Sequence, residues 1–141
     1  MGRRGPRGQN DTIELLRTAL RVLDDPVALQ DSPLAHLPVV RSAAARTFGR
    51  RICPEGQALA ALLLAALRSV ADGLGDHHPV GRLARMTAEG KTQAEVAHSL
   101  NVRPEHLSRH FKPLLLRCLL QELHRLDRES VPRETAENSV Q

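Results

Sequence analysis

Residues 91–112, KTQAEVAHSLNVRPEHLSRHFK, contain the pattern that decides the fold of the chain. Thr92 is a helix-capping residue type, and Glu95 follows three residues later, which predicts a capping box at the start of a helix. Asn101 stands where that helix must end, and asparagine tolerates the left-handed backbone conformation better than most residues. Pro104 fits the first turn of a second helix. The segment therefore predicts two short helices joined by a tight turn.

The apolar residues of this segment are spaced so that the two helices can pack across each other. The small side chain of Ala97 permits a close crossing, and Val102 can fill the corner of the turn. The other inward-facing residues are Val96, Leu100, Leu107 and Phe111. This pattern is typical of a helix-turn-helix, whose second helix keeps an exposed N-terminal face that can enter the major groove of DNA. Residues 103–112 are the expected recognition helix.

Polar and basic side chains of the segment are candidates for contacts with DNA. Arginine pairs with guanine, serine with several bases and glutamate with cytosine, whereas lysines at the helix margins suit phosphates. The candidate DNA-binding residues are Lys91, Thr92, Arg103, Glu105, His106, Ser108, Arg109 and Lys112. The arginines can instead be solvated surface charges, and a plain first-turn acid is the simpler interpretation of Glu105.

The two halves of the segment resemble different bacterial transcription regulators. TQAEVAHSLNV resembles the helix-turn-helix of LuxR-type regulators and of region 4 of sigma factors, and RPEHLSRHFK resembles the recognition helix of AraC-type regulators. The resemblance implies that Ala97 is the small residue between the helices and that Leu107 is the core residue of the recognition helix. It also implies that Arg109 and Lys112 are basic residues facing DNA.

Two positions depart from these family patterns. Asn101 stands where glycine is frequent, and Arg103 stands where serine or threonine often caps the helix. Upstream, DPVALQDSPLAHLPVV and GQALAALLLAAL are similar to a helical region that precedes a like helix-turn-helix in some large bacterial regulators and signalling ATPases. That similarity implies that residues 12–128 form one module.

The composition favours an all-α fold. The 141 residues are 41% apolar, but they include only two Phe and no Tyr or Trp. Strands favour β-branched and aromatic residues, whereas Leu and Ala, which are abundant here, are among the best helix formers. We expect a compact bundle of about six helices with the helix-turn-helix in its C-terminal part.

The chain divides by composition into a domain and two tails. Residues 1–10 are rich in Gly and Arg and predict a disordered basic tail, and the polar residues 129–141 predict a second one. Residues 11–128 are expected to form a single helical domain. Its first helix should start at Asp11 or Thr12. The further helices expected before the helix-turn-helix are at about 39–47, 54–72 and 80–88.

The leucine-rich stretch after Pro113 allows two interpretations. Leu116, Leu119, Leu123 and Leu126 repeat at intervals of three, four and three residues. This stripe can pack on the apolar run within 58–70, or it can form a dimer or partner interface. A dimer would double the phosphate contacts and suit a two-fold operator.

Charge and the remaining residues limit the function classes. The net charge is +4, and the excess lies in residues 1–10 and 82–128, which predicts an anionic partner. Arg3, Arg4 and Arg7 either reach into a minor groove or have no role. The two cysteines do not suit a disulfide framework, and His106 and His110 share a helix face without a further ligand nearby, so we expect no metal and no other cofactor.

These observations predict a bacterial, cytoplasmic transcription regulator that binds double-stranded DNA sequence-specifically. No catalytic pairing or phosphate loop is recognisable, so an enzyme is not expected. No signal peptide or membrane association is expected either. The alternative is a helical protein-interaction module that docks on RNA polymerase or on another regulatory protein through Leu114–Leu126 and has no DNA-binding role of its own.

Overall fold

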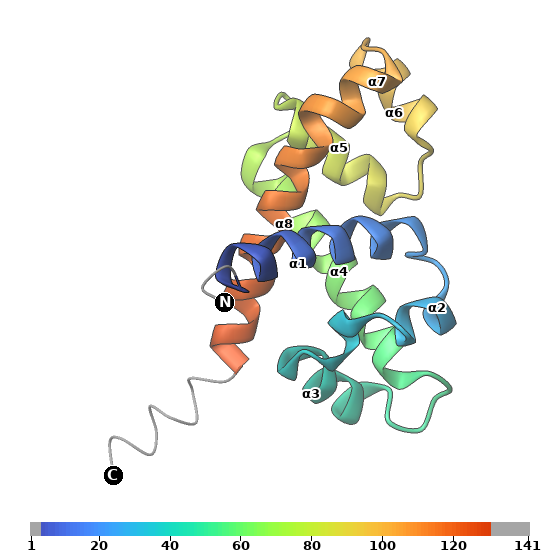
Figure 1. Cartoon of the computed structure of the whole chain (residues 1–141). Coiled ribbons are helices and arrows are strands. Elements are labelled where there is room, and N and C mark those ends of the chain that lie inside the picture. Colours follow the sequence, from blue (N-terminus) through green and yellow to red (C-terminus); the bar gives the residue numbers. More distant parts are fainter. Residues whose placement is uncertain (1–3, 131–141) are drawn as a thin grey trace. The chain divides into compact units, whose positions relative to one another are not determined.

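The computed structural model describes residues 4–130, which are all-helical and contain no strand (Figure 1). The expected tails at 1–3 and 131–141 lie outside the described residues. The elements are α1 (Arg4–Arg21), α2 (Pro26–Gln30), the 3₁₀ turn η1 (Pro33–His36), α3 (Pro38–Thr47), α4 (Pro54–Leu74), α5 (Pro79–Ala88), α6 (Gln93–Leu100), α7 (Pro104–His106), the π-helical turn η2 (Leu107–Phe111) and α8 (Lys112–Ser130). The predicted fold class, all-α, is confirmed.

Prolines set the starts of most of these helices. A proline is the first residue of α2, η1, α3, α4, α5 and α7. Proline is well suited to this position because its backbone torsion is already helical and its missing N–H group would have no partner within the helix. Side chains of Asp25, Ser32 and His78 add caps by accepting backbone N–H groups of the following turn.

Two helix boundaries differ from the sequence expectation. Helix α1 begins at Arg4 and not at Asp11 or Thr12, so residues 4–10 of the expected basic tail are helical. Extending an existing helix costs less than starting one, and Pro6 falls in the first turn, where proline is tolerated. At the other end, α8 continues to Ser130, two residues into the stretch expected to be a tail.

The contacts group the chain into two compact units, although residues 11–128 were expected to form a single domain. One unit comprises 1–63 together with 120–141, and the other is Leu64–Leu119. Helices α4 and α8 each contribute one end to each unit. The segment 91–112 lies entirely in the unit Leu64–Leu119.

In the first unit, Gln30 joins α2 to the start of α4. Its Nε2 donates to Oε1 of Glu55 (2.7 Å), and its Oε1 accepts the backbone N–H of Gly56 (2.8 Å). The hydrogen bond from Gln30 is the main reason that the pKa of Glu55 lies below its ordinary value. Gly56 is buried, and a Cβ at this position would overlap the carbonyl oxygen of Pro26. The close approach of α2 to α4 therefore requires glycine.

In the second unit, Arg85 of α5 forms ion pairs with two carboxylates at and just after the end of α4. Its guanidinium pairs with Asp76 (2.9 Å) and with Asp72 (3.0 Å). Hydrogen bonds to these two carboxylates raise the pKa of Arg85. The main chain then links α5 to the next segment, because the N–H of Lys91 donates to the carbonyl of Met86 (3.0 Å). Figure 1 shows α5, α6 and α7 next to one another.

The core is built from leucine, alanine and valine, and in the described part of the chain no polar or charged side chain is buried. Leu59, Leu63 and Leu67 of α4 are completely buried. Among the described helices, α4 alone has the length and mean hydropathy of a membrane-spanning helix, a test that core helices of soluble proteins also pass.

The leucine stripe of α8 is mostly used inside the chain. Leu116, Leu119 and Leu123 are at most 2% exposed, and only Leu126 is half-buried. The packing of a single chain therefore covers three of the four residues that the sequence offered to a dimer or partner.

Gly56→Ala should test the contact between α2 and α4. We expect it to lower the free energy of unfolding by about 1–3 kcal/mol, because the added methyl group must push the two helices apart. Gly73→Ala is the matched control, since a Cβ there meets nothing within 4 Å. The control should be neutral or stabilising by up to about 1 kcal/mol, because alanine is the better helix former. Urea denaturation measures both; equal effects would contradict the close approach.

Candidate functional site

Helix α6 starts with the predicted capping box. The N–H of Thr92 donates to Oε1 of Glu95 (2.8 Å), and the N–H of Glu95 donates to Oγ1 of Thr92 (3.1 Å). The hydrogen bond from the Thr92 backbone is the largest cause of a pKa of Glu95 below its ordinary value of 4.5. Val96 and Ala97 are buried on the inner face of α6, as predicted. The sequence offered Thr92 as a DNA contact, and its observed role is capping.

The turn after α6 has the predicted left-handed residue. Asn101 has φ 60° and ψ 44°. Its N–H donates to the carbonyl of His98 (3.1 Å), and the N–H of Val102 donates to the carbonyl of Ala97 (3.0 Å). These two bonds form a Schellman motif, which satisfies carbonyls at the end of the helix. The turn thereby fixes the direction in which the chain leaves α6.

The second helix differs from the expected isolated recognition helix. Residues 104–130 are continuously helical, and the turn Leu107–Phe111 is π-helical, closed by the N–H of Lys112 on the carbonyl of Leu107. We attribute the π turn to Pro113, whose ring would press on the carbonyl of Arg109 and which has no N–H to donate in an α-helix. The helix was expected to end before Pro113, and this proline was the available signal for the π turn.

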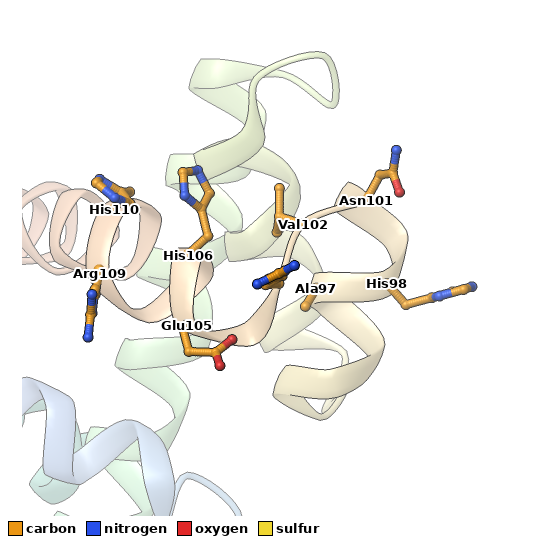
Figure 2. Close-up of a pocket in the computed structure, with 9 residues that line it drawn as sticks. Ala97, His98, Asn101, Val102, Glu105, His106, Arg109 and His110 are labelled. Carbon is orange, nitrogen blue, oxygen red and sulfur yellow. The ribbon is translucent and has the colours of Figure 1, made fainter.

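A shallow groove runs between α6 and the second helix (Figure 2). It is lined by Ala97, His98, Asn101, Val102, Arg103, Glu105, His106, Arg109 and His110. Four of the predicted DNA-binding residues, namely Arg103, Glu105, His106 and Arg109, are therefore brought together. The other four are Lys91 and Ser108, which are exposed, Lys112, which is half-buried, and Thr92; none of them lines the groove.

Three polar residues of the groove were not among the predicted DNA-binding residues. These are His98, Asn101 and His110, and the only signal for the histidines was their spacing from His106. The ring centroids of His106 and His110 lie 4.4 Å apart, and the Phe111 ring meets His106 edge-on at 5.1 Å. In the described residues, no group of three or more potential ligands is placed to hold a metal ion.

The charges around the groove are mostly unneutralised positive ones. The unit Leu64–Leu119 has eight basic and five acidic side chains. Asp72 and Asp76 are paired with Arg85, and Glu95 is bonded within the capping box. Within the described part of the chain, neither Arg103 nor Arg109 forms an ion pair, and both are exposed. The groove can therefore attract an anion.

Comparison of the chain with models of protein families, with curated proteins and with solved structures gives no match.

Asn101→Ala should test the left-handed turn. We expect a loss of about 1 kcal/mol in the free energy of unfolding, because a Cβ makes the left-handed conformation unfavourable and alanine lacks the polar side chain that helps asparagine adopt it. Asn101→Gly should be neutral or slightly stabilising, since glycine adopts this conformation freely. Thermal unfolding compares the two variants, and a glycine variant as unstable as the alanine variant would contradict the proposed role of the turn.

Glu95→Gln should show how the capping carboxylate of Glu95 makes the unfolding free energy depend on pH. Because the folded pKa of Glu95 lies below its unfolded value, its contribution to stability is present above about pH 4.5 and is lost as the pH falls through the folded pKa. Glutamine does not titrate but keeps an amide oxygen that can accept the Thr92 N–H. The unfolding free energy of the variant should therefore fall less steeply than that of the wild type between about pH 5 and 3. Identical slopes would exclude this contribution.

Proposed function

We propose that the chain is a sequence-specific regulator of transcription that binds double-stranded DNA through a helix-turn-helix at residues 91–112. In this proposal α6 is the first helix, Asn101 makes the turn, and the helix from Pro104 is the recognition helix. The observation that carries the proposal is the pair of exposed arginines, Arg103 and Arg109, which line one groove without ion-pair partners in the described structure. Arginine forks match phosphates and guanine edges.

The packing around the turn supports this proposal. Ala97 and Leu107, the two residues that the resemblance to bacterial regulators assigned to the helix crossing, are buried. The second helix leaves its first turn exposed, with Pro104, Glu105 and His106 all accessible. An exposed first turn is what a recognition helix needs in order to enter a major groove. Lys91 precedes α6, and Lys112 lies within the continuous helix that begins at Pro104; both would reach phosphates.

The alternative function, docking of a protein partner through Leu114–Leu126, has less support. Leu115, Leu116, Leu119, Leu120 and Leu123 are buried within the chain. Leu114 is 45% exposed, and one such leucine is a small surface for a partner. DNA binding in the bacterial cytoplasm therefore remains our leading proposal. Whether two copies of the chain pair is a separate question, which light scattering answers.

Titration of full-length protein into a pool of random duplexes, followed by fluorescence anisotropy, tests the proposal. Affinity should fall steeply with salt, because each neutralised phosphate releases counterions and adds about −0.9 to the logarithmic slope. Arg109→Ala should weaken binding to the selected sequence by about 1–3 kcal/mol. Arg68→Ala removes the same charge from an exposed site on α4 and is the matched control.

Circular dichroism should show that both variants are folded. Salt-independent binding would mean that phosphate contacts are not its source. Equal losses in Arg109→Ala and Arg68→Ala would show that net charge, and not the groove, governs affinity. No binding to any duplex by the folded wild type would overturn the proposed function.

A further inference from the structure

Glu105 is an acidic residue in the middle of an otherwise basic groove. It is exposed and lines the groove together with Arg103 and Arg109. In the described structure it forms no ion pair with either arginine, although Arg109 follows it by four residues on the same helix. A carboxylate facing DNA is repelled by the phosphates, so it weakens binding unless it accepts a hydrogen bond from the DNA itself.

The major groove offers a carboxylate two kinds of donor. These are the N4 amino group of cytosine and the N6 amino group of adenine. Adenine carries an acceptor, N7, next to its amino group, and this acceptor repels a carboxylate that reaches for N6. Cytosine has no acceptor of its own in the major groove. The carboxylate of Glu105 therefore suits cytosine better than any other base.

Arg109 is placed to act with Glu105 on the same stretch of DNA. Figure 2 shows Glu105 and Arg109 projecting to one side of the helix, and His106 and His110 to the other. Four residues of an α-helix rise about 6 Å, and the rise from Glu105 to Arg109 is somewhat smaller because the π turn Leu107–Phe111 lies between them. Successive base pairs are about 3.4 Å apart, so this separation corresponds to between one and two base-pair steps, and two flexible side chains can reach neighbouring base pairs. The fork of Arg109 matches N7 and O6 of guanine.

We propose that Glu105 and Arg109 read neighbouring G·C base pairs in the major groove. Glu105 accepts a hydrogen bond from the N4 amino group of a cytosine, and Arg109 donates to a guanine. This inference rests on the proposed DNA-binding function and adds the base pairs that the groove selects. Glu105 is then a specificity-determining residue. The hydrogen bond that it accepts offsets its repulsion from phosphates only at a site that offers cytosine.

Selection from random duplexes, with relative affinities read by sequencing of the bound pool, tests this inference on the full-length protein. The wild type should select a site with a C·G pair next to a guanine contact. Glu105→Gln should change the preference at one position from cytosine to adenine by on the order of tenfold, because an amide both donates to N7 and accepts from N6 of adenine. Arg109→Ala should relax the preference at the neighbouring guanine.

Glu89→Gln is the matched control, since it removes an exposed acid from the same unit outside the groove. It should raise affinity slightly for all sequences and leave the selected site unchanged. If Glu105→Gln behaves in the same way, Glu105 is a surface acid and the inference is wrong. A wild type that binds duplexes without a G·C preference overturns this inference alone, whereas a wild type that binds no duplex overturns the proposed function as well.

Discussion

The left-handed turn at Asn101 is the constraint on which the candidate site depends. Its backbone bonds, from Asn101 to His98 and from Val102 to Ala97, determine where the chain leaves α6. Burial of Ala97 and Leu107 then holds the next helix against the first. Every exposed side chain from residue 103 to residue 110 takes its direction from this arrangement. A change in the turn would therefore move the arginines of the groove together, even though none of them takes part in the turn.

Features set by neighbouring residues could be predicted from the sequence. The capping box joins residues three apart, and the left-handed turn involves one residue type. Such signals work because their free energies depend on a few adjacent backbone groups. The all-α class followed from composition in the same way, since leucine and alanine favour helices.

Features that depend on distant or competing contacts were not predicted. The hydrogen bond from Gln30 to Glu55 joins residues twenty-five apart, and nothing in the local sequence pattern marks them as partners. The start of α1 at Arg4 overrides a good capping position at Asp11 or Thr12. The π turn arises because the helix continues through Pro113 to contribute buried leucines, whereas the proline was expected to end the helix. Only half of the candidate DNA-binding residues line the groove. Helical spacing predicts which residues share one face of a helix, but it does not predict which other element that face meets.

The distribution of carboxylates explains why the groove keeps its positive charge. Arg85 engages both Asp72 and Asp76, and the capping box engages Glu95, so most acids of this unit are occupied at structural positions. Exposed ion pairs of this kind contribute little to stability. Their larger consequence is electrostatic, because each acid held elsewhere is one that does not neutralise Arg103 or Arg109. Glu105 is the exception in the groove, and an unpaired acid at that position makes affinity for a featureless anion lower than the arginines alone would give. The groove is thus better suited to distinguish among polyanions that carry hydrogen-bond donors than to bind all of them equally.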